Sequence, residues 1–141
     1  MIIIDSGVYN MKGDGFIGKF FARGEEWWWL FLRVIAGIIF ILHGLSKFGK
    51  GTPGTLFLIA GIIEIVGGIL IVLGLWTRLV ALIAAIEMIV AWFIAHAPRG
   101  WDPLTNGGEP ALLFLILFIA LLLHGGGKYA LEHVFHKKEI F

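Results

Sequence analysis

Residues 55–76 read TLFLIAGIIEIVGGILIVLGLW, and this stretch decides the fold. Glu64 is its only charged residue and lies close to its middle. At about 1.5 Å per residue, a helix of this length extends roughly 33 Å, which is enough to cross the hydrocarbon core of a bilayer. The stretch therefore predicts a transmembrane helix that carries one acid inside the membrane.

Glu64 shares one helix face with two glycines, because Gly61, Glu64 and Gly68 are spaced at i, i+3 and i+7. An ionisable group at this depth is costly if it faces lipid, so we expect it to face other helices. Glycines on the same face let those helices approach closely. Two interpretations stay open: Glu64 is a structural acid bonded to a neighbouring helix, or it belongs to a cofactor or proton site.

The composition extends this prediction to the whole chain. Of its 141 residues 59% are hydrophobic, and the mean hydropathy is +0.93. A soluble domain is usually nearer half apolar, so we predict a single-domain, all-α polytopic membrane protein in contact with the lipid bilayer. The absence of cysteine excludes disulfides, thiol catalysis and cysteine-ligated metal centres. A net charge of +1 without a basic stripe argues against nucleic-acid binding.

The apolar runs predict a four-helix bundle within a membrane domain of residues 27–127. The predicted spans are residues 27–48, 55–76, 77–97 and 110–124. Residues 1–26 form an N-terminal tail, which could be mobile or include a short amphipathic helix on the membrane surface. Residues 128–141 form a charged C-terminal tail.

Basic residues predict the orientation, because they favour the cytoplasmic side of a membrane. With four spans, both tails lie on one side. The seven basic residues on that side are Lys12, Lys19, Arg23, Arg78, Lys128, Lys137 and Lys138, against Lys47, Lys50 and Arg99 on the other. We therefore predict a multi-pass protein of the cell membrane with both termini cytoplasmic (N-in, C-in).

This orientation gathers five polar side chains toward the outer face. His43 and Lys47 lie near the outer end of the first span, and His96 lies at the outer end of the third. Glu109 opens the fourth span, and Glu64 lies beneath the other four. We predict that these five residues line one site.

The remaining polar groups receive other assignments. Arg33 lies in the inner part of the first span and is a candidate partner for Glu64 or Glu87, unless it extends to inner headgroups. Glu87 is nine residues from His96, about 180° around a helix, so the two cannot face one site. Glu87 is therefore assigned to a contact with another subunit. We predict that His124, His133 and His136 are not ligands, and we predict no metal site.

A quinone suits the outer site best, since it needs an apolar slot for its tail and polar groups near its carbonyls. An acid or a histidine can exchange the quinol proton, which makes His43, Glu64 and His96 the candidate catalytic residues. Lys47 and Arg99 could attract an anionic substrate. A haem held by His43 and His96 is a weaker alternative.

The chain resembles the DoxX family of small four-helix membrane proteins. The resemblance rests on LRVIAGIIFILHGLSKFG (32–49), GIIEIVGGILIVLGLWTR (61–78), Met88 with His96, GGEPALL (107–113) and GGGKY (125–129). Family members commonly close the fourth span with a Gly-Pro-Gly-like turn and Ser-Leu-Asp, where this chain has GGGKYALEH. The first 26 residues lie outside the resemblance.

The resemblance implies a redox role, because the family is named for its similarity to the membrane subunit of a thiosulfate:quinone oxidoreductase. It suggests a subunit that passes electrons from a sulfur compound or another donor to quinone. Whether the chain is itself catalytic stays open. The alternatives are a non-catalytic anchor for partner subunits of a larger redox complex and, less favoured, a small transporter. A chain this small is also expected to form a homo-oligomer.

Overall fold

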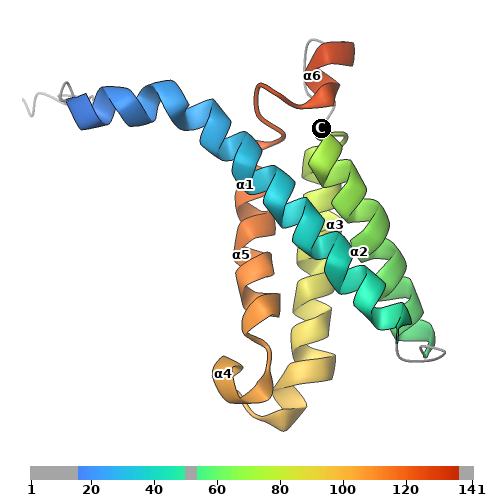
Figure 1. Cartoon of the computed structure of the whole chain (residues 1–141). Coiled ribbons are helices and arrows are strands. Elements are labelled where there is room, and N and C mark those ends of the chain that lie inside the picture. The colour runs from blue at the N-terminus through green and yellow to red at the C-terminus, as the bar shows by residue number, and fades with distance from the viewer. Residues whose placement is uncertain (1–15, 50–53, 137–141) are drawn as a thin grey trace, which may run out of the picture.

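The structure is a computed structural model and describes residues 16–49 and 54–136 (Figure 1). Its elements are α1 (Phe16–Phe48), α2 (Thr55–Leu73), α3 (Thr77–Ala91), the π-helical turn η1 (Trp92–His96), the 3₁₀ turn η2 (Ala97–Arg99), α4 (Pro103–Asn106), α5 (Glu109–His124) and α6 (Leu131–His136). The predictions for residues 1–15, 50–53 and 137–141 lie outside the described residues.

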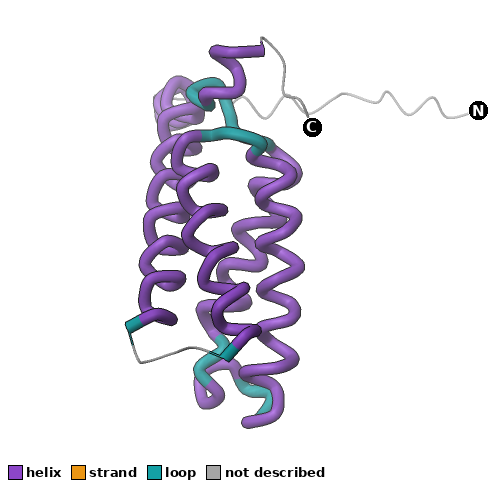
Figure 2. The backbone as a smooth tube through the Cα atoms, turned by 90° about the vertical axis from the view of Figure 1, so that its right-hand side faces the viewer, coloured by secondary structure: helices purple, strands orange, loops and turns teal. Residues whose placement is uncertain are grey.

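The long helices α1, α2, α3 and α5 run up and down beside one another (Figures 1 and 2). Three segments of the described chain are long and apolar enough to cross a membrane, namely Gly24–Phe48, Thr55–Leu73 and Thr77–Arg99. The fourth, α5, has 16 residues and is about 24 Å long. The predicted all-α, multi-pass membrane architecture is thus confirmed, while the cytoplasmic position of the termini stays a prediction.

The two ends of the bundle differ in structure. One end carries the start of α3 and the short helix α6, and we call it the α6 end; α4 lies at the other, the α4 end (Figure 1). At the α6 end, α2 stops at Leu73, because Gly74 adopts a left-handed conformation with φ 69°. The predicted span continued to Trp76, which instead lies in the connection to α3 with φ 48°.

The first helix is longer than its predicted span, because α1 starts at Phe16. Part of the predicted N-terminal tail, residues 16–26, therefore continues the first membrane helix without a break. Figure 1 shows this part of α1 extending sideways beyond the bundle at the α6 end.

The α1–α2 contact is built on four glycines, two from each helix. A Cβ atom added to Gly37 would lie 2.7 Å from the carbonyl oxygen of Gly68, and one added to Gly44 would lie 2.8 Å from that of Gly61. The backbones therefore touch at two levels, seven residues apart on each helix. This close approach explains why α1 packs more extensively on α2 than on any other helix.

We expect Gly68→Ala to lower the free energy of unfolding by about 1–3 kcal/mol, because an added methyl group overpacks the contact. Its Cβ would lie 2.6 Å from Cγ1 of Ile41 and 2.7 Å from the carbonyl oxygen of Gly37. The midpoint of unfolding in detergent measures this loss. Gly54→Ala is the control, because no atom lies within 4 Å of a Cβ added there. Equal midpoints for the two variants would contradict the close contact.

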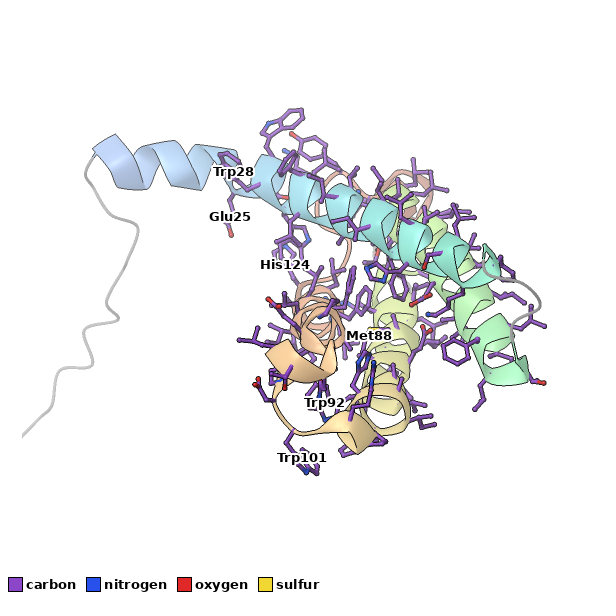
Figure 3. The ribbon with its side chains drawn as sticks, turned by 60° about the horizontal axis from the view of Figure 1, so that its bottom comes forward. Glu25, Trp28, Met88, Trp92, Trp101 and His124 are labelled. Carbon is purple, nitrogen blue, oxygen red and sulfur yellow. The ribbon has the colours of Figure 1, made fainter. Side chains whose placement is uncertain are left out.

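The apolar core lies mainly between α3 and α5, with one aromatic ring from α1. Small side chains on α3, among them Ala81 and Ala84, are fully buried and let α5 approach closely. Phe40 of α1 packs edge-on against Phe118 of α5, with ring centroids 4.7 Å apart. Met88 and Trp92 lie between α3 and α5 (Figure 3).

Arg33 is fully buried at the α6 end and holds three parts of the chain together. Its Nη1 donates hydrogen bonds to the carbonyl oxygens of Ile71 (2.7 Å) and Val72 (3.0 Å) in the last turn of α2. Its Nη2 donates to the carbonyl oxygen of Tyr129 (3.2 Å), just before α6. A cation suits this position, because the C-terminal end of a helix carries partial negative charge.

The predicted pairing of Arg33 with Glu64 or Glu87 is therefore wrong. The acid that interacts electrostatically with Arg33 is Glu132 of α6, which is only 4% exposed. Glu132 also accepts a long hydrogen bond (3.4 Å) from the backbone N–H of Thr77 at the start of α3. Sequence reasoning placed Glu132 in a charged surface tail and so missed its burial.

Tryptophans lie at both ends of the bundle, as expected for residues at membrane interfaces. Trp28 and Trp101 are both exposed and lie at opposite ends of the molecule (Figure 3). Trp29 instead contacts the chain that follows α5. Its Nε1 donates to the carbonyl oxygen of Gly125 (3.1 Å), and its ring lies 4.1 Å from that of His124.

Candidate functional site

The five residues predicted to share one site occupy three separate places in the α4-end half of the bundle. Lys47 and Glu64 form a buried ion pair between α1 and α2. His43 and Glu109 line a groove between α1 and α5. His96 lies in η1 and bonds to the loop that follows it.

The ion pair joins the end of α1 to the middle of α2. Nζ of Lys47 donates to a carboxylate oxygen of Glu64. Glu64 is buried, with 4% of its side chain exposed, while Lys47 keeps 21%. Gly44 makes room for the pair, because a Cβ added there would lie 3.0 Å from the Cβ of Glu64. The glycine-flanked face of α2 thus meets a cation from the facing helix.

Glu87 of α3 belongs to the same charged centre. It is close enough to Glu64 and Lys47 to interact electrostatically with both. Glu87 and Lys47 also line one cavity between α2 and α3, of about 120 Å³, whose other walls are almost entirely apolar. We call Lys47, Glu64 and Glu87 the charged centre.

The assignment of Glu87 to another subunit is not supported, because both carboxylate oxygens are buried within this chain. The sequence does contain a signal that Glu87 faces a neighbouring helix. Small residues flank Glu87 at Ala84 and Ala91, with the same i−3 and i+4 spacing that Gly61 and Gly68 have around Glu64. Both acids therefore lie on small-residue faces that allow close helix packing.

His96 is the last residue of the π-helical turn η1. Because a π-helical turn has more residues than an α-helical turn, it changes the direction of the His96 side chain relative to α3. Its Nδ1 lies 3.3 Å from the carbonyl oxygen of Asn106 and 3.1 Å from an Nη atom of Arg99. Arg99 is exposed and also donates to the carbonyl oxygen of Ala95. His96 and Arg99 thus form a polar pair at the end of η1 and in η2. Lys47, which was predicted to attract an anion together with Arg99, is instead paired with Glu64.

The groove between α1 and α5 has a volume of about 720 Å³. His43 and Glu109 lie at its α4 end, since α1 ends and α5 begins there. The imidazole of His43 packs edge-on against Phe114, with ring centroids 5.5 Å apart. Toward the α6 end the groove is apolar. Its apolar walls are Phe31, Leu32, Ile35, Ala36, Ile39, Pro110, Leu113, Phe114 and Leu117.

This arrangement does not support a haem between two histidines. His43 lines the groove between α1 and α5, and His96 does not. The Nδ1 atom of His96 is engaged with Asn106 and Arg99. The imidazole of His43 packs instead against Phe114 in the groove.

Fold and site together define a small multi-pass membrane protein with a buried charged centre and a lateral groove. The chain belongs to the DoxX family, whose family model matches residues 28–97. An uncharacterized protein of Haemophilus influenzae is 45% identical over 121 residues, which cover 77% of this chain and 90% of that protein.

Two further relatives carry more descriptive names. A Bacillus subtilis protein named "Putative oxidoreductase CatD" is 35% identical over 114 residues, which cover 73% of this chain and 83% of that protein. An uncharacterized membrane protein of Mycobacterium tuberculosis is 27% identical over 131 residues, with 76% and 80% covered. No solved structure matches the chain.

Proposed function

We propose that this protein is the membrane subunit of a redox system and binds a quinone in the groove between α1 and α5. The observation that carries the proposal is the form of this groove. It is apolar over most of its length and carries His43 and Glu109 at one end. An isoprenoid tail fits the apolar part, and a quinone head fits the polar end.

The two polar residues supply what a quinone head requires. A quinone takes up two electrons and two protons on reduction. His43 can donate a hydrogen bond to one carbonyl oxygen, and its imidazole can act as a proton donor or acceptor. Glu109 is exposed at the start of α5 and can pass protons between the groove and water. The edge contact with Phe114 holds the His43 ring.

The comparisons support the redox part of this proposal, and the groove supports the quinone part. One relative is named as an oxidoreductase, and the chain shares 35% identity with it. The electron donor would then approach from the α4 end, where the exposed Arg99 is available to contact an anionic sulfur compound. Lys47 is less available for that role, because Glu64 holds it. The donor class is inferred from the family resemblance alone.

A second function, anchoring partner subunits of a larger complex, is favoured by one feature of α1. This helix has 33 residues and extends beyond the bundle at the α6 end (Figure 1). A projecting helix offers a surface to another protein. Purification of the intact protein from its own membranes distinguishes the two functions. Quinone in the solvent extract supports the first, and a stoichiometric partner without quinone supports the second.

We expect His43→Ala and Glu109→Ala each to weaken quinone binding about tenfold, the effect of losing one polar contact of roughly 1.4 kcal/mol. Quenching of tryptophan fluorescence by a titrated quinone, with the protein in lipid nanodiscs, measures the affinity. His133→Ala is the matched control, because His133 is exposed and lies outside the groove. Unchanged affinity in both groove variants would count against the proposed site.

A further inference from the structure

We infer that Glu87 is a proton-binding site inside the membrane domain. Its carboxyl group holds a proton at neutral pH and exchanges it through the cavity between α2 and α3. This inference does not rest on quinone binding, since Glu87 does not line the groove between α1 and α5. It rests on the surroundings of the Glu87 side chain.

Neither carboxylate oxygen of Glu87 has a hydrogen-bond partner among the described residues, and both are buried. A buried carboxylate without hydrogen bonds is strongly disfavoured, whereas the neutral acid costs far less to bury. The geometry of Glu87 therefore favours the protonated form.

Two charged side chains face Glu87 from the neighbouring helices. From α1 comes Lys47 and from α2 comes Glu64, and these two already pair with each other. On the other side, α5 carries no ionisable residue between Glu109 and His124. The single cation of the centre is thus shared by two acids. One proton on Glu87 makes the centre neutral.

A cavity offers a route between Glu87 and the outside of the bundle. Glu87 lines the cavity between α2 and α3 together with Lys47, and the other lining residues are apolar. Those residues are Leu56, Phe57, Ala60, Val90, Ala91, Ile94 and Ala95. Leu56, Phe57 and Ile94 are themselves exposed at the outside of the bundle. The cavity therefore opens at the outside of the bundle and has Glu87 in its wall.

The test uses dicyclohexylcarbodiimide, an apolar reagent that reacts with protonated carboxyl groups. The intact protein in liposomes is treated across a series of pH values, digested with trypsin and analysed by mass spectrometry. Cleavage after Lys50, Arg78 and Arg99 gives two peptides with one carboxyl side chain each: residues 51–78 contain Glu64, and residues 79–99 contain Glu87. The two acids are thus read separately in one sample.

We expect the label on peptide 79–99 and at least tenfold less on peptide 51–78, because the carboxylate of Glu64 is engaged by Lys47. The label on Glu87 should fall as pH rises, since deprotonation removes the reactive form. Glu87→Gln should abolish it and should also remove the infrared C=O band of a protonated carboxylic acid. A wild-type protein without that band at neutral pH would overturn the inference. A band without any label on peptide 79–99 would overturn exchange through the cavity.

Discussion

Replacement of Arg33 by methionine is expected to abolish or nearly abolish folding of this protein in the membrane. Methionine fills a similar volume but donates no hydrogen bond. The carbonyl oxygens of Ile71, Val72 and Tyr129 would lose their donor, and the buried carboxylate of Glu132 would lose a cation with which it interacts electrostatically. Leaving a buried hydrogen-bond acceptor without its donor costs about 1–3 kcal/mol, and three acceptors are affected here. That loss is comparable with the whole stability of many proteins.

The unfolding midpoint in detergent and the yield of monodisperse protein measure this effect. Arg99→Met is the matched control, because Arg99 is exposed and its hydrogen-bond partners, Ala95 and His96, lie in the adjacent turn η1. Arg33→Lys should recover part of the loss, since lysine keeps the charge but cannot reach α2 and Tyr129 together. If Arg33→Met unfolds at the same midpoint as the control, Arg33 does not hold the α6 end together.

The family and the all-α membrane architecture could be predicted from the sequence, because both depend on local features. Long apolar runs give spans, and the spacing of Gly61 and Gly68 around Glu64 gives a buried face. Lys47, which meets Glu64, was also among the predicted site residues. These features can be predicted from helical periodicity alone, which is visible in the sequence.

The rest of the site depends on contacts between segments that are far apart in the sequence. Helical periodicity does not predict these contacts. Arg33 and Glu132 come together only because the chain after α5 folds back over the end of α2, beside the middle of α1. The direction of His96 depends on the π-helical turn, which breaks the regular rotation of α3 on which the prediction relied. Glu87 was assigned by its angle to His96, although its alanine neighbours indicated a packed face.

Replacement of Lys47 by methionine is the second change with a large expected effect. It leaves the carboxylate of Glu64 buried in the membrane domain without its ion-pair partner. Breaking a buried pair from one side costs about 3–5 kcal/mol, and the partial exposure of Lys47 places the loss near the lower value. Glu64→Met should cost less, because the lysine it leaves behind can extend toward water.

The double variant Lys47→Met with Glu64→Met decides whether the ion pair itself is the cause. Replacing a whole buried pair by apolar residues is often close to neutral, so the double variant should regain most of the stability lost by Lys47→Met. Unfolding midpoints of the four proteins in detergent form a double-mutant cycle, with Lys128→Met as a control at an exposed lysine. Losses that simply add would show that the two side chains act independently. A strong coupling would instead show that the glycine-lined contact of α1 with α2 is locked by one ion pair, which also fixes the surroundings of Glu87.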